Sequence, residues 1–432
     1  MDPRTFAHQT LAESRDEILQ VVQDLIRLQS RNMPPGGEER ACQEYLASYL
    51  RRAGLAVDLY EPDQAPGLVE HPAFWPGRDY GNRPNLHSHL AGRGGGRSLL
   101  LSGHVDTVAL GDNVWTHPPF AAEISDGKLY GLGTIDMKAA MGVMAVLYKA
   151  LAERGVRLRG DLNYECVVDE EEGGVNATIA GRLRYGAVDG ALIPEGTDLK
   201  LYPAARGALI TDFIFSSTKG SWLDVGKSAA KTADAVKQIG IFLTHIDELS
   251  AVRRRHPAHP LYASYPDPAP VQVTKVYAGG WGNQVPIGVP PEGRIELVMQ
   301  TLPGETREAV RGEMIDWLES VIARHEDAFV TRPELRHRLR WIMPTALAPD
   351  HPLVTTMAKC ARQVLGGDPQ VVGAPFSCDM FALQEIFKIP GIIFGPTGAN
   401  AHAADEYVEV ESLFAFGEAL LLFVMDWCGV ED

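Results

Sequence analysis

The segment RSLLLSGHVDTV, residues 97–108, constrains the fold of this chain more than any other stretch. Its unbroken apolar run predicts a central strand that is covered on both faces. The run ends on His104 and Asp106, an imidazole and a carboxylate two residues apart. The segments around it alternate between strand and helix patterns, which is typical of an α/β sheet. We therefore predict an α/β domain that carries chemically active side chains where this strand ends.

A different pattern follows Tyr202 and indicates an inserted domain. The strand patterns there are GALITDFIFSST, PVQVTKVYAGG and GRIELVMQTLP, and the helix patterns are KTADAVKQIGIFLTHIDELS and ETREAVRGEMIDWLESVIARHED. A set of this kind can fold as its own two-layer domain. We predict a first domain formed by residues 1–203 and 343–432, interrupted by a smaller two-layer α+β domain at residues 204–342.

The composition limits the classes of binding partner and the cellular compartment that we expect. The chain has 432 residues, of which 45% are hydrophobic, and a formal net charge of −16. An acidic chain repels phosphate backbones, so we expect no nucleic-acid partner. The five cysteines are scattered and form no CxxC pair, which indicates a reducing compartment. The first residues lack an apolar signal segment and ALLLFVMDW is too short to span a bilayer, so we expect a cytoplasmic protein without a membrane partner.

Side chains that can bind metals follow several of the predicted strands. They are His104, Asp106, Asp136, Asp169, Glu170, Glu171, Glu172, Glu195 and His402. Each one alone is more often structural, but ligand sites in open α/β sheets lie beyond the carboxyl ends of strands, so we expect the set to gather. Gathered carboxylates repel one another and are costly to bury, and a divalent cation resolves both problems. Imidazole and carboxylate ligands suit zinc, and also manganese or cobalt.

Motifs spread along the chain occur in the order found in a known family. They are SGHVDTV, WTHPPFAAEISDGKLYGLG, GLGTIDMKAAM, VVDEEEGG, ALIPEG and GANAHAADEYV. On these motifs the chain resembles the dinuclear-zinc hydrolases that include acetylornithine deacetylase, succinyl-diaminopimelate desuccinylase, aminoacylase and carboxypeptidase G. The resemblance covers nearly the whole chain. It implies a catalytic domain with a mixed, mostly parallel sheet flanked by helices, an inserted lid and dimerisation domain, and a homodimer or higher homo-oligomer.

The resemblance also implies a role for each matched residue. One metal ion would be bound by His104 and Glu195 and a second by Glu171 and His402, with Asp136 as the bridge, Asp106 orienting His104 and Glu170 as general base and acid. A cis peptide between Asp136 and Met137 is implied as well. We accordingly expect one or two divalent ions per subunit, with zinc favoured over manganese and cobalt.

Two positions depart from the family pattern. Trp222 stands where relatives carry a lid histidine, and Lys219 and Lys227 are nearby substitutes. Trp222 either packs within the inserted domain or lines a pocket for a flat or aromatic substrate. Gln300 stands where relatives place an arginine for the substrate carboxylate. Because glutamine cannot reproduce the bidentate, charge-assisted fork of arginine, the usual N-acyl amino acid pose is not supported.

Other polar residues are candidates with open interpretations. Asn283 keeps the asparagine of the family, and Arg206 is either an anion contact near the hinge or a surface arginine. Asp379 follows Cys378 in a turn before a predicted helix, where a helix cap is favoured over contact with the ligand residues. Without an accompanying histidine and asparagine constellation, Cys378 is not expected to be a nucleophile.

Together these features predict a metal-dependent hydrolase that breaks a carbon–nitrogen bond in a small molecule. The first interpretation is amide hydrolysis of the deacylase or aminoacylase kind, in which Glu170 activates a water. The substrate could be an aromatic amide or a formylated heterocycle. One alternative is an aminohydrolase that releases ammonia from a small aromatic amine. Another is a non-catalytic metal-binding or scaffold relative, which the intact Glu170 disfavours.

Overall fold

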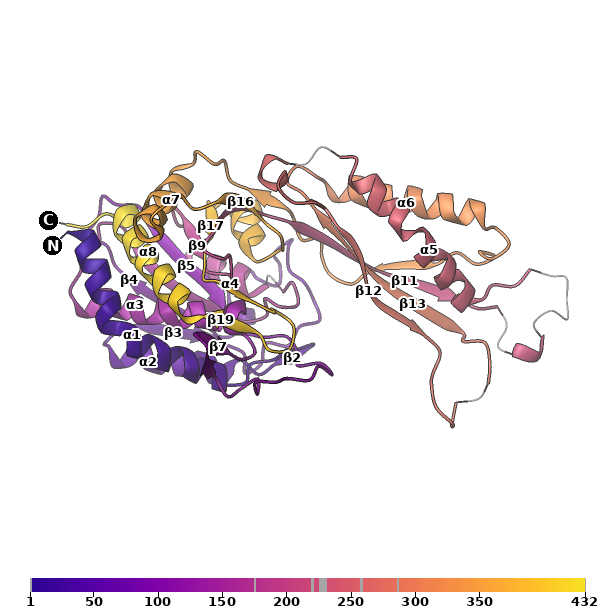
Figure 1. Cartoon of the computed structure of the whole chain (residues 1–432), viewed down its shortest axis with the longest axis horizontal. Coiled ribbons are helices and arrows are strands. Elements are labelled where there is room, and N and C mark those ends of the chain that lie inside the picture. Colours follow the sequence, from indigo (N-terminus) through magenta and orange to yellow (C-terminus); the bar gives the residue numbers. More distant parts are fainter. Residues whose placement is uncertain are drawn as a thin grey trace. The chain divides into compact units, whose positions relative to one another are not determined.

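The chain forms two compact units in the computed structural model (Figure 1). The structure describes residues 2–174, 176–218, 221–224, 231–256, 259–285 and 287–431. The first unit comprises Met1–Ala204, Ala346–Ala374 and Cys378–Asp432, and the second comprises Ala205–Thr345 and Pro375–Ser377. Lys219 and Lys227, the predicted substitutes near Trp222, lie outside the described residues.

The first unit is built on a nine-stranded mixed sheet. Its strand order is β15-β10-β17-β9-β5-β8-β4-β3, with β16 paired to β10. The strands are β3 (Val57–Tyr60), β4 (Asn85–Leu90), β5 (Leu99–His104), β8 (Leu162–Val167), β9 (Ala191–Ile193), β10 (Leu201–Ala205), β15 (Thr345–Ala346), β16 (Val371–Ala374) and β17 (Gly391–Ile393). The four central strands β17, β9, β5 and β8 run parallel, whereas β3, β4 and β10 pair antiparallel with their neighbours. The predicted α/β class is therefore confirmed.

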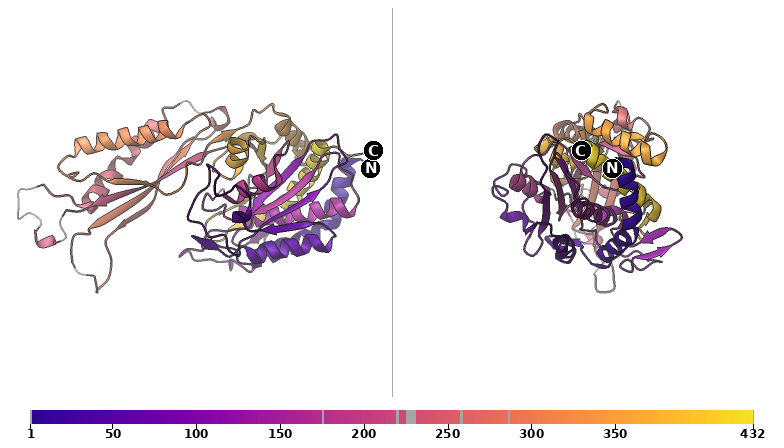
Figure 2. Two further views of the ribbon diagram at one scale, coloured as in Figure 1. Left: turned by 180° about the vertical axis from the view of Figure 1, so that it is seen from behind. Right: turned by 90° about the vertical axis from the view of Figure 1, so that its left-hand side faces the viewer.

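Strand β5 is the apolar run of the sequence, and all of its residues are buried. Helices cover this sheet. They are α1 (Pro3–Arg27), α2 (Arg40–Arg52), α3 (Ala139–Glu153), α4 (Asn176–Tyr185), α7 (Pro352–Leu365) and α8 (Val410–Cys428). Helices α1, α3 and α8 pack against one another, although α1 and α8 come from opposite ends of the chain (Figures 1 and 2).

A second, small sheet of the first unit joins two loops that are far apart in the sequence. Its antiparallel strands follow the order β18-β19-β7-β6. They are β6 (Glu123–Ser125), β7 (Lys128–Tyr130), β18 (Gly398–Ala399) and β19 (Tyr407–Glu409), and a further short pair is β1 (Asn32–Met33) with β2 (Gly36–Gly37). The helical turns of this unit are η1 (Pro62–Gln64), η2 (Thr134–Lys138) and η5 (Ala382–Ile386). Because β7 pairs with β19, the segment that leads to Asp136 lies beside the loop that carries His402.

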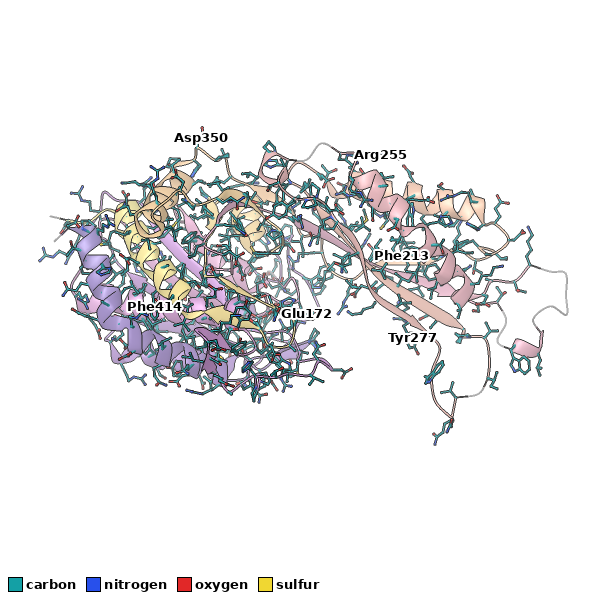
Figure 3. All side chains as sticks on the ribbon, in the orientation of Figure 1. Glu172, Phe213, Arg255, Tyr277, Asp350 and Phe414 are labelled. Carbon is teal, nitrogen blue, oxygen red and sulfur yellow. The ribbon has the colours of Figure 1, made fainter. Side chains whose placement is uncertain are left out.

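The second unit is a four-stranded antiparallel sheet with two helices. The strand order is β12-β13-β11-β14. The elements are β11 (Gly207–Ser216), η3 (Trp222–Asp224), α5 (Ala235–Arg253), η4 (Pro260–Tyr262), β12 (Val271–Ala278), β13 (Glu292–Thr301), α6 (Arg307–Arg324) and β14 (Glu334–His337). Phe213 of β11 packs with Phe242 and Trp317 in the core between sheet and helices, whereas Tyr277 of the edge strand β12 is exposed (Figure 3). This is the two-layer α+β arrangement that the sequence predicts.

Two further observations concern membrane-spanning helices and the cysteines. In the part of the chain that the structure describes, no helix is long and apolar enough to cross a membrane. All five cysteines are buried and free.

Candidate metal centre

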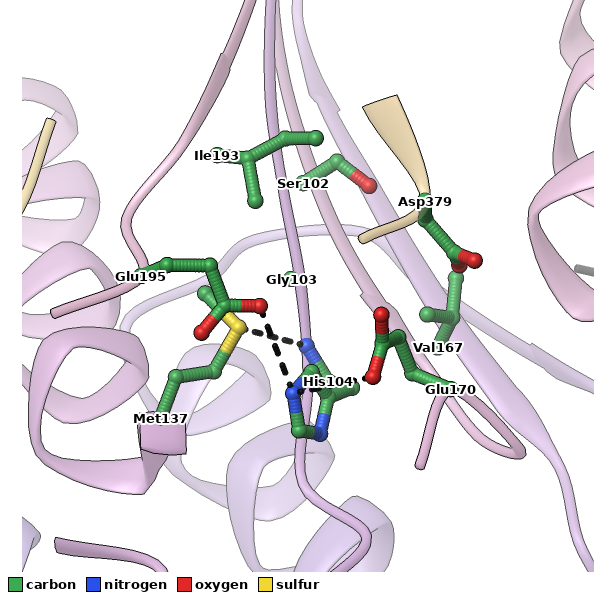
Figure 4. Close-up of a pocket in the computed structure, with 9 residues that line it drawn as sticks. All are labelled: Ser102, Gly103, His104, Met137, Val167, Glu170, Ile193, Glu195 and Asp379. Carbon is green, nitrogen blue, oxygen red and sulfur yellow. Dashed lines mark hydrogen bonds and ion pairs between the residues drawn. The ribbon is translucent and has the colours of Figure 1, made fainter. Parts of the chain in front are cut away.

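The predicted metal-binding side chains come together in the first unit. His104 is the last residue of β5, and Glu195 lies two residues beyond β9. Glu170 and Glu171 follow β8, Asp136 lies in η2, and His402 lies in the loop between β18 and β19. Figure 4 shows His104 between the carboxylates of Glu170 and Glu195. The carboxyl ends of the parallel strands thus gather residues that the sequence scatters over about 300 positions.

Three carboxylates surround the imidazole of His104. Its Nε2 atom lies 3.1 Å from Oδ1 of Asp136, 3.5 Å from Oε1 of Glu195 and 3.7 Å from Oε2 of Glu170. This Nε2 atom is buried and has no hydrogen-bond partner among the described residues. A buried nitrogen that faces several carboxylates without a hydrogen bond fits the ligand atom of a cation.

A second half of the site faces the other oxygen of Asp136. Nε2 of His402 lies 3.1 Å from Oδ2 of Asp136 and 2.7 Å from Oε2 of Glu171. The carboxylate of Asp136 therefore lies between the two histidines, as a bridging ligand must. The peptide bond that follows Asp136 is cis.

Two overlapping sets of these residues have ligand atoms close enough to share one ion. The first is His104, Asp136 and Glu171, and the second is His104, Glu170 and Glu195, with the ligand atoms of each set within 4.8 Å of one another. The geometry therefore fits two neighbouring cations better than one isolated ion.

The electrostatics of the cluster call for added positive charge. Burial raises the pKa of Glu170 well above its usual value, and burial together with the charge of Asp136 raises the pKa of Glu171 to about 8. Burial alone would lower the pKa of His104, but the nearby carboxylates of Asp106 and Asp136 outweigh it and raise that pKa. Gathered carboxylates of this kind disfavour full ionisation in a buried site, and a divalent cation would compensate their negative charge.

A model of the peptidase family M20/M25/M40 matches residues 100–426. This chain belongs to that family. Its curated relatives include the N-formyl-4-amino-5-aminomethyl-2-methylpyrimidine deformylases of Bacillus subtilis (strain 168) and Halalkalibacterium halodurans. The first is 25% identical and the match covers 99% of each chain; the second is 24% identical, with 96% of this chain and 95% of the relative covered.

A solved structure supports the fold of this M20/M25/M40 member over its full length. The di-peptidase Dug1p of Saccharomyces cerevisiae superimposes with a TM-score of 0.73 at 14% identity, and the match covers 100% of both chains. Family membership and the named relatives confirm the predicted class, a hydrolase that acts on carbon–nitrogen bonds.

Asp106 connects the two halves of the M20/M25/M40 site. Nδ1 of His104 donates to the main-chain oxygen of Asp106 at 3.0 Å and lies 3.4 Å from its Oδ1. The orienting contact therefore involves the carbonyl as much as the predicted carboxylate. The other carboxylate oxygen accepts the amide of Asn32 at 2.9 Å and the N–H of Glu171 at 3.0 Å. One residue thus fixes both the ring of His104 and the turn that carries Glu171.

A buried polar network lies behind the turn that carries Glu171, and sequence reasoning missed it. Asp169 has a φ of 69°, which is uncommon for a residue other than glycine. Its carboxylate accepts hydrogen bonds from Arg78, from Tyr80 at 2.7 Å and from Asn32 at 3.3 Å. Arg78 also donates to the amide oxygen of Asn32. These contacts hold the chain in the conformation that precedes Glu170, and no motif in the sequence pointed to Asn32 or Arg78.

Asp379 does not cap a helix as predicted. The helical turn η5 is flanked by Phe381 and has no side-chain cap, whereas the carboxylate of Asp379 accepts a hydrogen bond from the hydroxyl of Thr178. Asp379 lines a water-sized cavity (Figure 4). The remaining lining residues are Ser102, Gly103, His104, Met137, Val167, Glu170, Ile193 and Glu195.

The predicted substrate contacts lie in the second unit. Trp222 and Asn283 are exposed. Arg206 is buried, and its guanidinium donates to Oε1 of Gln300 at 2.5 Å and to the main-chain oxygens of Pro375 and Asp267. Arg206 and Gln300, which the sequence offered as separate candidates, therefore form one hydrogen-bonded pair. Their roles toward substrate stay predictions.

Proposed function

We propose that this M20/M25/M40 member is a metal-dependent deformylase that hydrolyses the formamide of an N-formylated aminopyrimidine. The observation that carries the proposal is the likeness to the Bacillus subtilis deformylase, which extends over 99% of both chains. A formylated heterocycle is also one of the substrates that the departures from the family pattern suggest.

The surroundings of Gln300 support a substrate without an amino-acid carboxylate. A glutamine offers no charge-assisted fork to a carboxylate, and its amide oxygen is already engaged by Arg206. That hydrogen bond also occupies part of the guanidinium of Arg206. A neutral heterocyclic formamide needs neither group as an anion site.

The five predicted ligands would hold the metal ions. His104 and Glu195 would bind one ion and Glu171 and His402 the other, with Asp136 shared. Zinc is the favoured metal because imidazole and carboxylate ligands suit it, and manganese and cobalt are the alternatives. Divalent ions in these positions supply polarisation of the formyl oxygen and a lowered pKa for the attacking water.

The protein's own residues would carry the proton transfers. Glu170 takes a proton from the water as oxygen adds to the formyl carbon, and then gives that proton to the leaving amine nitrogen. The carbon–nitrogen bond breaks, and the products are formate and the free aminomethyl compound. Asp106 keeps the ring of His104 oriented throughout because its main-chain oxygen accepts a hydrogen bond from Nδ1.

The test is a product assay with the zinc-loaded protein and N-formyl-4-amino-5-aminomethyl-2-methylpyrimidine. We expect equal amounts of formate and amine, no ammonia, and lower kcat/KM for N-acetyl amino acids and dipeptides. The Glu170→Gln variant with its metal bound is the matched inactive control. Ammonia release would instead establish the aminohydrolase alternative, and bound metal without turnover of any carbon–nitrogen substrate would favour a binding protein.

We also propose a cytoplasmic homodimer that associates through the second unit. The edge strand β12 exposes Val276 and Tyr277, and exposed edge strands with apolar side chains favour pairing with another chain. The buried, free cysteines are consistent with a reducing compartment. Light scattering with a charged substitution at Tyr277 tests the dimer, which the substitution should dissociate.

A further inference from the structure

The two histidines of the candidate metal centre are held by different means. The side chain of His104 is 1% exposed and belongs to a central strand, whereas that of His402 is 53% exposed. His402 lies in a loop at a φ of 60°, outside any helix or strand. The position of His402 relative to Asp136 therefore depends on what anchors this loop.

Glu406 is that anchor. It lies four residues after His402 in the same loop, and it is buried. Its Oε2 accepts the N–H of Gly133 at 2.8 Å. Its Oε1 accepts the N–H of Ile135 at 2.9 Å and that of Asp136 at 3.2 Å.

All three donors belong to the short segment that presents Asp136. The main-chain oxygen of Glu406 also accepts the N–H of Gly131, and the next residue, Tyr407, pairs with Tyr130 between β19 and β7. Main-chain and side-chain contacts of one residue thus join the loop of His402 to the segment of Asp136. The carboxyl group of this one residue accepts three N–H groups of that segment.

We propose that Glu406 is a positioning residue that sets the spacing between Asp136 and His402 and thereby the affinity of the more exposed ion position. The inference rests on the metal centre proposed above. Glu406 does not bind the ion itself; it fixes where two of the ligands stand.

The Glu406→Gln substitution separates this role from simple packing. It keeps the size of the side chain but replaces one acceptor oxygen with an NH2 donor, so at least one of the three N–H groups faces another donor. We expect the weaker of two zinc-binding steps to lose affinity by about 10- to 100-fold, the range found when outer partners of metal ligands are removed. The tighter step should change less, because His104 and Glu195 do not depend on this loop.

A neighbouring carboxylate provides the matched control. Asp405 accepts the N–H groups of Thr116 at 2.8 Å and His117 at 2.9 Å, and neither belongs to a proposed ligand segment. Asparagine tolerates the positive φ of this position. The Asp405→Asn variant should therefore keep both zinc affinities.

The experiment is a calorimetric titration of the metal-free full chain with zinc, together with thermal unfolding of each metal-free variant. The proposal holds if Glu406→Gln weakens the second step more than the first, if Glu406→Asp, which keeps both acceptor oxygens, recovers part of that loss, and if each metal-free variant still unfolds cooperatively. Equal loss in both steps, no loss, or the same loss in Asp405→Asn would overturn it. A wild-type chain that binds no zinc would instead overturn the metal centre itself.

Discussion

The two histidines that face Asp136 lie in contrasting parts of the first unit. His104 ends a buried strand and is oriented by Asp106, which is itself held by Asn32. His402 stands on a half-exposed loop whose anchor, Glu406, reaches a segment about 270 residues away in the chain. The sheet prearranges one half of the site through local geometry. The other half depends on a few long-range hydrogen bonds, so the two halves should respond differently to substitution.

The largest effect should come from Glu170, which lies on the His104 side. The Glu170→Gln change removes the group that moves the proton, and losing a placed general base typically costs about 10²- to 10⁴-fold in rate. We expect kcat to fall by that amount while metal content, measured by mass spectrometry, stays at the wild-type level. Near-normal turnover would show that the carboxylate of Glu170 has no catalytic role.

The next effect compares the two histidines directly. His104→Ala should lower zinc affinity by more than about 100-fold, the upper end of the range for losing an outer partner, because a ligand itself is removed. His402→Ala should cost less, since water can reach its half-exposed position and replace the imidazole. Competition with a chromogenic chelator measures both. Equal losses would break the distinction between a prearranged and a loop-dependent half.

A smaller effect is expected for the scaffold of His104. Asn32→Ala removes the amide that bridges Asp106 and Asp169, and the tighter zinc affinity should fall by about 10- to 100-fold. Asn163→Ala is the control, because this buried asparagine donates to the main-chain oxygen of Leu99 and contacts none of the proposed ligands or their anchors. The same chelator competition measures both zinc affinities. A loss confined to the weaker ion would show that Asn32 supports the His402 side of the site and not the His104 side.

The smallest expected effect is on the stability of the fold. It concerns a histidine that lies away from the proposed metal ligands. His87 of β4 stacks on Tyr185, and burial lowers its pKa from 6.5 to about 4. Because the folded state favours the neutral ring, its stabilisation is complete above about pH 6.5 and is lost as the pH falls through 4. In urea unfolding with chelator present, His87→Gln should lose less free energy of unfolding between pH 7 and 4.5 than wild type. An identical acid loss in both proteins would contradict this account.

The parts of the molecule that followed from sequence are those with local signals. The apolar run of β5 predicted a buried strand that ends at His104, and ordered motifs predicted which residues stand beside it. Asn32, Arg78 and Glu406 carried no such signal, because their partners lie 46 or more residues away and their own segments have no periodicity. The expected cap at Asp379 failed for the same reason, since a distant hydroxyl, that of Thr178, competes with the local helix terminus.

The hydrogen bond between Arg206 and Gln300 has a consequence for substitutions at position 300. The pairing of β11 with β13 sets Ala208 opposite Gln300, and the side chain of Gln300 accepts a hydrogen bond from the guanidinium of Arg206. Reinstating an arginine at position 300 alone would press two like charges together. An arginine at position 300 would therefore need a compensating substitution at position 206.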